Sequence, residues 1–292
     1  RSACEASLER LNADMIDLYQ IHFDDPNTHV LETVTALETL VEEGKIRHYG
    51  ICHLSEQRAR EYAEIGDLFS ILMELSPVAT TSLETLLPVC LDYGLAAFAF
   101  SITGRGILTG RYPADHVFEP GDIRRMDPLF KRERFDSAHR IRKYLTDLGA
   151  QYDRPAVQMG TAWVLAQPQV VCALTGTSST LHLHENLAAS EIAFENGDLE
   201  NLNQFFKDEQ ALLEVTQRHT IDRLLLEPLT GEPEQAFNDL VYILETAIMI
   251  GAVCEGDVIS AFKELFSIQG LSDQATCRNT ECIQIYLNRL IF

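Results

Sequence analysis

Residues 7–22 read Ser7-Leu-Glu-Arg-Leu-Asn-Ala-Asp-Met-Ile-Asp-Leu-Tyr-Gln-Ile-His22, and the pattern that recurs along the chain is already present in them. The spacing predicts the end of an amphipathic helix near Leu11, followed by an apolar strand over 15–21 that stops at a histidine. A helix that leads directly into an apolar strand is typical of proteins that alternate the two elements.

The same alternation continues for the first two thirds of the chain. Gly44 and Gly94 are predicted to end two helices, and Ser55 is the predicted N-cap of a third. Five strands separated by helices indicate βαβ units and a parallel sheet. The remaining strands are expected over 46–51, 69–73, 96–100 and 170–174, and the helices over 31–43, 55–62, 82–93, 137–152, 155–167 and 179–189.

The composition limits the classes of partner. A net charge of −21 argues against nucleic acid or an anionic membrane surface, because phosphate binding needs clustered Lys and Arg. No apolar run approaches the roughly 20 residues that span a bilayer. No Walker lysine loop or GxGxxG follows a strand, which counts against a P-loop or a doubly wound dinucleotide fold.

The seven cysteines are scattered and show no CxxC spacing. This usage is typical of reduced thiols, and it predicts a cytoplasmic protein. Cys277 and Cys282 form the only close pair in the sequence, and neither a histidine nor a second pair accompanies them. We therefore predict no metal site from the sequence.

The pattern changes after about residue 194, where helical periodicity continues without strands. We expect a division into residues 1–194 and a helical extension over 195–292, which would serve as an interaction module. Its helices are expected over 199–225, 234–250, 257–266 and 282–290, with a turn or linker over 228–233.

Five segments in order resemble the aldo-keto reductase family. Residues 7–22 are similar to the family pattern SLxRLxxDYIDLYxIH, and residues 99–112 are similar to AYSPLGRGLLTGKY. Each segment alone is weak, but five in the right order over roughly residues 5–190 are specific. The other three are residues 37–50, 162–168 and 174–187.

The resemblance implies an α/β fold of the (β/α)8 TIM-barrel type, in which these segments correspond to strands four to eight. The first three strands have no counterpart here, and the all-helical C-terminal extension does not replace them. Because a closed barrel needs every strand, we expect a fragment of a longer chain, or a second chain that supplies the missing strands. A half-barrel that folds alone is less favoured, since it leaves strand edges unpaired.

The resemblance also implies an oxidoreductase that moves hydride between NADP or NAD and a small carbonyl or alcohol substrate. The family's catalytic tetrad is Asp, Tyr, Lys and His, and its first three members come from the early strands. His22 corresponds to the fourth, which orients the substrate carbonyl and assists proton transfer. The alternative is a structural histidine at the rim of the barrel.

Several cofactor positions of the family are matched. Phe100 corresponds to the aromatic residue that stacks on the nicotinamide. The glycine and arginine of the loop after it suit a pyrophosphate. The loop residues are Ser101, Thr103, Gly104 and Arg105, and the adenosine end is matched by Thr177, Glu185 and Asn186. Glu185 and Asn186 have the alternative of being ordinary polar residues of a helix.

Other positions depart from the family pattern. Cys52 and His53 replace the Ser-Asn pair that holds the carboxamide, and Met73 replaces a glutamine. A thiol and a thioether are weak hydrogen-bonding groups. The basic residues that meet a 2′-phosphate are also replaced, so no preference between NADP and NAD follows. The residues at those positions are Gly176, Ser178 and His182.

A basic island lies in residues 122–132, with Arg124, Arg125, Lys131 and Arg132. It is either a loop near an anionic ligand or a solvated charge run.

Two readings stay open for the function of the whole protein. The departures at Cys52 and His53 favour, as the alternative to an enzyme, a reductase-like scaffold that binds a small molecule. Such a scaffold would present its helical tail to a protein partner.

Overall fold

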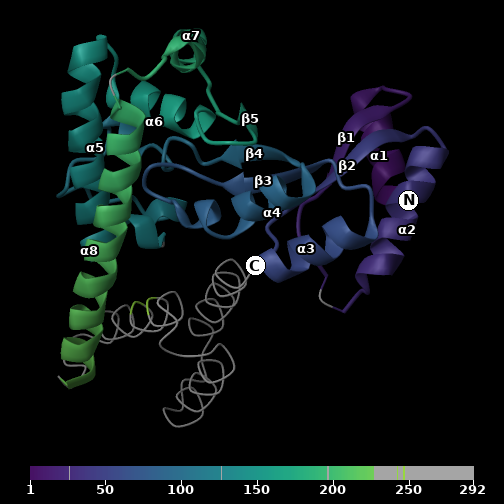
Figure 1. The fold of residues 1–292 in the computed structure, drawn as a ribbon, viewed down its shortest axis with the longest axis horizontal. Helices are drawn as coiled ribbons and strands as arrows, with labels where there is room; N and C mark the ends of the chain where they lie inside the picture. Colours follow the sequence, from purple (N-terminus) through teal and green to yellow (C-terminus); the bar gives the residue numbers. More distant parts are fainter. Residues whose placement is uncertain (26, 126, 196, 227–241, 243–245, 247–292) are drawn as a thin grey trace.

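The computed structural model describes residues 1–25, 27–125, 127–195, 197–226, 242 and 246. Its centre is a five-stranded parallel sheet in which each strand pairs with the next along the chain (Figure 1). All five predicted strands are confirmed, and so is the parallel sheet. The strands are β1 (Ile16–Ile21), β2 (Ile46–Cys52), β3 (Ser70–Glu74), β4 (Ala96–Phe100) and β5 (Val170–Ala173).

Helices separate the strands as the periodicity predicts. The helix caps are confirmed: Ser55 accepts a hydrogen bond from the backbone N–H of Arg58, and Gly44 and Gly94 adopt left-handed φ angles of 69° and 67°. The helices are α1 (Ser2–Leu11), α2 (Val30–Glu42), α3 (Glu56–Ile65), α4 (Leu86–Tyr93), α5 (Arg132–Tyr152), α6 (Ala156–Leu165), α7 (Thr180–Ala188) and α8 (Asp198–Leu226).

Two predicted helix starts are wrong. The helix expected from residue 82 is divided into a 3-10 turn, η1 (Thr81–Leu83), and α4, and α5 begins at Arg132 instead of residue 137. Each start holds a single apolar residue among polar ones, Leu83 and Phe135, which is too few to define a helical periodicity. Further 3-10 turns lie in the long connection after β4 and after α7, at η2 (Ile107–Thr109), η3 (Ile123–Arg125), η4 (Pro128–Phe130) and η5 (Ala189–Glu191).

The two faces of the sheet differ. Ile51, Ile71 and Ala97 belong to the hydrophobic core, on the face against which α2, α4 and α6 pack. Successive residues of a strand point to opposite faces, so Gly50 and Ser70 lie on the other face, which we call the inner face. There a Cβ on Gly50 would stand 2.4 Å from the Ser70 hydroxyl oxygen. Any residue other than glycine would therefore clash with Ser70 at this position.

The first helix after residue 194 packs on the sheet domain. The predicted helix over 199–225 is confirmed as α8, which runs alongside α5 (Figure 1). Phe206, 3% exposed, meets the Trp163 ring edge-on at a centroid distance of 4.9 Å. The Trp163 indole N–H donates to Asn203 at 2.8 Å, and Glu209 accepts from Arg140 at 2.9 Å. These contacts join α8 to the same core as the sheet.

The remaining predictions for the C-terminal part lie outside the described residues, apart from Tyr242 and Thr246, which are both helical. They concern the linker over 228–233, the helices over 234–250, 257–266 and 282–290, and the pair Cys277 and Cys282. Within the part of the chain that the structure describes, no helix is both long enough and apolar enough to cross a bilayer.

The docking of α8 can be tested by replacing Phe206 with alanine. Phe206→Ala should lower the free energy of unfolding by about 3 kcal/mol, because it removes a buried aromatic side chain and leaves a cavity. Urea denaturation measures the loss. The matched control is Leu212→Ala on the same helix, where the side chain is 46% exposed and the expected change is within about 0.5 kcal/mol. Equal losses in both variants would contradict this packing.

Candidate active site at the strand ends

The C-terminal ends of the strands bring the predicted site residues together. Parallel pairing places Ile21 beside Ile51, so the residues that follow, His22 and Cys52, leave neighbouring strands at the same level. The ring of His53 lies 5.4 Å from that of His22 and 5.1 Å from that of Phe100, measured between centroids. The edge at which parallel strands end is where barrel enzymes carry their catalytic groups.

The backbone of this edge is conformationally unusual. His53, Ser101 and Arg105 have left-handed φ angles between 53° and 55°, which non-glycine residues adopt infrequently. Gly104 is left-handed as well, and a Cβ there would stand 2.5 Å from a methyl carbon of Val78. Backbone of this kind costs free energy and gathers at binding and catalytic sites.

Cys52 is the most enclosed residue of the group, with a relative exposure of 1%. Burial raises the pKa of its thiol to about 11, so the sulfur is protonated at neutral pH. A neutral thiol is a weak hydrogen-bond donor and acceptor, and it holds a carboxamide less well than a serine hydroxyl does. The possible donor atoms of His22, Cys52 and His53 all lie within 4.8 Å of one another.

Arg105 already has partners within the protein. Its guanidinium lies 2.9 Å from a carboxylate oxygen of Glu74 and 3.0 Å from one of Asp127. Burial raises the pKa of Glu74, and Asp127 adds to this, while the positive charge of Arg105 opposes both. A pyrophosphate bound here would therefore share Arg105 with two carboxylates or displace them.

The residues predicted for the adenosine end lie on the surface, in the turn after β5 and on α7. Thr177, Ser178, His182 and Glu185 are exposed, and Asn186 is partly buried. The Thr177 hydroxyl donates to the Ser179 carbonyl at 3.0 Å and accepts from the Ser179 backbone N–H at 3.1 Å, which fixes the turn before α7. This group is local in sequence, and the structure keeps it together as one patch.

Met73 is not brought together with the other predicted cofactor residues. It is 1% exposed and belongs to the hydrophobic core between the sheet and the helices, so the sheet separates it from the inner face. The strand residue that pairs with Cys52 is Leu72, which is partly exposed. Sequence reasoning missed Leu72, although the two-residue alternation of strands, counted from Phe100 through its partner Glu74, points to it.

Two arginines of the basic island, Arg124 and Arg132, have partners within the protein. The Arg124 guanidinium pairs with Asp122 at 2.5 Å and lies 4.7 Å from the centre of the Tyr112 ring. Arg132 lies over the ring of Tyr242 at 4.6 Å. These contacts give both arginines a structural partner, and they favour a role in ordering the loop.

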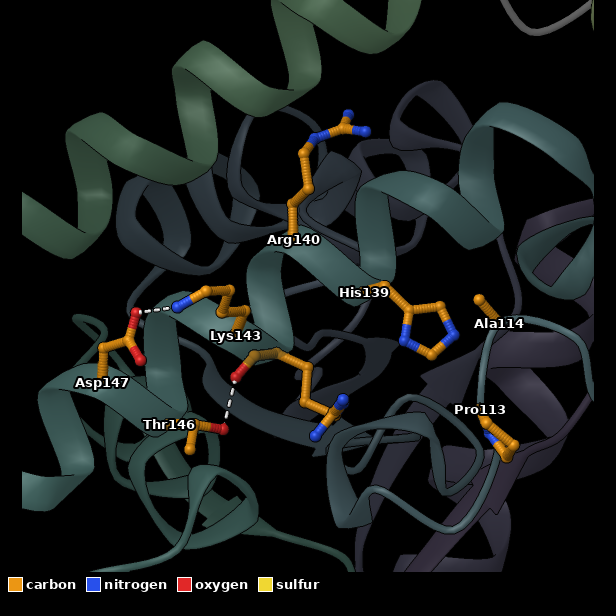
Figure 2. Close-up of a pocket in the computed structure, with 8 residues that line it drawn as sticks. Pro113, Ala114, His139, Arg140, Lys143, Thr146 and Asp147 are labelled. Atoms are coloured by element: carbon orange, nitrogen blue, oxygen red, sulfur yellow. Dashed lines mark hydrogen bonds and ion pairs between the residues drawn. The ribbon is translucent and has the colours of Figure 1, made fainter.

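A shallow pocket of about 570 Å³ lies against α5, away from the strand ends (Figure 2). It is bordered by Pro113, Ala114 and α5 side chains that include His139 and Arg142. Burial lowers the pKa of His139, and the nearby charge of Arg142 adds to that effect. The pocket contains none of the site residues predicted from the sequence.

Comparison with curated proteins gives relatives of one kind. The aldo-keto reductase str7 of Strobilurus tenacellus is 33% identical over 195 residues, which are 66% of this chain and 58% of that protein. The NADH-specific methylglyoxal reductase of Escherichia coli K12 is 32% identical over 201 residues, 68% of this chain and 61% of the enzyme. The chain thus spans about three fifths of the length of these relatives.

Comparison with solved structures gives proteins of the same kind as the curated relatives. A glycerol dehydrogenase from Gluconobacter oxydans superposes with a TM-score of 0.65 at 26% identity, covering 72% of this chain and 63% of that one. An aldo-keto reductase from Bacillus halodurans gives a TM-score of 0.55 at 27% identity, covering 70% and 65%. The model of the aldo/keto reductase family matches residues 1–207, and the chain therefore belongs to the aldo/keto reductase family.

Proposed function

We propose that this chain carries the cofactor-binding half of an NAD(P)H-dependent oxidoreductase that interconverts small carbonyl compounds and alcohols. The observation that carries the proposal is the convergence of the His22, His53 and Phe100 rings at the ends of β1, β2 and β4. The methylglyoxal reductase and the glycerol dehydrogenase among its relatives support a small polar substrate.

The sheet is proposed to be strands four to eight of an eight-stranded barrel. Within the described residues, β1 and β5 each pair on one side only, and such open edges are closed in a barrel. Three further strands from elsewhere in the protein, or from a second chain, would complete it. Residues 1–194 then form the barrel part and residues 195–292 a helical extension, which α8 anchors through Phe206 and Glu209.

Each predicted site residue would have the role that the family resemblance implies. When bound, the nicotinamide supplies the hydride. Phe100 offers an aromatic face to it, while Ser101, Thr103, Gly104 and Arg105 surround the pyrophosphate. The patch at 177–186 would hold the adenosine end, with either NAD or NADP. His22 would hydrogen-bond the substrate oxygen and assist its protonation, since an imidazole can both donate and accept a proton.

A second candidate function is supported by the same site. The buried thiol of Cys52 and the two carboxylates around Arg105 weaken the usual contacts with the carboxamide and the pyrophosphate. A binding scaffold without turnover is consistent with both features. The two candidates differ in one measurement: a protein that includes all eight strands should reduce small aldehydes with NADH or NADPH only if it is the enzyme.

The role of Arg105 can be measured on the chain as it is, since all the proposed cofactor residues lie on it. Titration with NADH and NADPH, followed by cofactor fluorescence, should show binding. Arg105→Ala should weaken that binding about tenfold, because a charge-assisted hydrogen bond contributes roughly 1.5–3 kcal/mol. The matched control is Arg60→Ala on α3, whose guanidinium also contacts two carboxylates, those of Glu56 and Asp92. An equal effect in both variants would contradict the assignment.

Asp127 should limit the same binding. Asp127→Asn should raise the affinity for NADH and NADPH by about fivefold, because it removes a negative charge worth roughly 1 kcal/mol beside the phosphates. Asparagine keeps the helix cap that Asp127 provides to Leu129, so the local fold should be preserved. Isothermal titration calorimetry checks the gain. An unchanged or weaker affinity would show that the phosphates bind away from Arg105.

A further inference from the structure

We propose that His22, Cys52 and His53 form a binding site for a zinc ion. Their donor atoms, one per residue, lie within 4.8 Å of one another at the ends of β1 and β2. Imidazole and thiolate are both ligands that Zn²⁺ takes in proteins, whereas copper sites built on the same set usually add a weak axial ligand such as methionine. The Cys52 thiol, protonated in the metal-free protein, would release its proton as the ion binds. This ligand set cannot be recognised from residue spacing, because a helix and a strand separate His22 from the Cys52-His53 pair.

The required movement is small. A tetrahedral zinc ion with bonds of about 2.0–2.3 Å places its ligand atoms roughly 3.5 Å apart. The present separations of at most 4.8 Å exceed this by at most about 1.3 Å, a gap that we expect side-chain rotation, chiefly of His22, to close. Cys52 is fixed in the last position of β2, whereas the exposed His22 has room to turn toward it.

The surroundings favour a bound cation. The Cys52 side chain is 1% exposed, and the His53 ring lies between Phe23, stacked at 4.9 Å, and Phe100, edge-on at 5.1 Å. These two rings contact the His53 imidazole and hold it in place. The chain also carries a net charge of −21, which raises the local concentration of cations.

Three protein ligands leave a fourth position of the tetrahedron empty. Such a position is typical of zinc sites that bind water or a small molecule, whereas purely structural zinc sites have four protein ligands. Because His22 lies at the exposed side, the fourth position would face the solvent and accept water, a carboxylate or a carbonyl oxygen. The ion would occupy the place of the carboxamide, so zinc and NAD(P)H should exclude each other.

Cobalt substitution tests the site on the whole 292-residue chain. Titration of the metal-free protein with Co²⁺ should saturate at one equivalent, with a thiolate-to-cobalt charge-transfer band in the near ultraviolet and intense visible bands of four-coordinate cobalt. Zn²⁺ should remove these bands. Cys52→Ser should abolish the charge-transfer band. His53→Asn should weaken cobalt binding by at least about tenfold, since the loss of a residue that only hydrogen-bonds to a metal ligand already lowers metal affinity that much.

The matched controls are Cys172→Ser and His29→Asn, which change the same residue types outside the cluster and should leave the titration unaltered. A wild-type spectrum without the charge-transfer band, or one that Cys52→Ser leaves intact, would overturn the proposal. If Cys52→Ser fails to fold, as judged by circular dichroism, the wild-type spectrum and His53→Asn decide. The inference does not rest on the reductase activity: cobalt binding without nucleotide binding would sustain it and refute only the proposed function.

Discussion

The parallel register between β1 and β2 is the constraint on which the candidate site depends. It sets Ile21 beside Ile51 and brings His22, Cys52 and His53 to one edge of the sheet. A slip by one residue would turn every side chain of a strand to the opposite face. Gly50 opposes a slip of β2, because a Cβ moved into its position would stand 2.4 Å from the Ser70 hydroxyl oxygen of β3 and 3.2 Å from Gln20 Cγ of β1.

The helices act on the site from the other face. They bury Ile51, Ile71, Met73 and their neighbours in one core, which fixes the strands at the level of their backbones. The inner face, by contrast, carries small and polar groups such as Gly50, Ser70 and Gln20, whose amide donates to the Ser70 hydroxyl at 3.2 Å. The apolar packing that fixes the strands and the polar groups of the inner face therefore lie on opposite faces of the sheet.

Sequence reasoning succeeded where the governing interactions are local. Apolar runs identify all five strands. Gly44 and Gly94 mark helix ends because the left-handed backbone conformation at those positions favours glycine. It failed where partners are distant in the chain. Nothing local to Arg105 reveals that Glu74 and Asp127 neutralise it, and an offset of one residue placed Met73, not Leu72, at the site. His22, Cys52 and His53 were each predicted at the site, but their closeness as a possible metal-ligand set was missed for the same reason.

The left-handed backbone at His53 restricts how this site can change over evolutionary time. Histidine, asparagine and aspartate are the non-glycine residues that tolerate such a φ angle best, so the turn after β2 accepts few residue types. The Ser-Asn pair usual in the family and the Cys-His pair found here both satisfy that restriction. Two point mutations thus separate an amide-binding pocket from one with metal-type ligands, and neither mutation requires the loop to be rebuilt. The same backbone turn can therefore present either amide-binding side chains or the metal-type side chains proposed here.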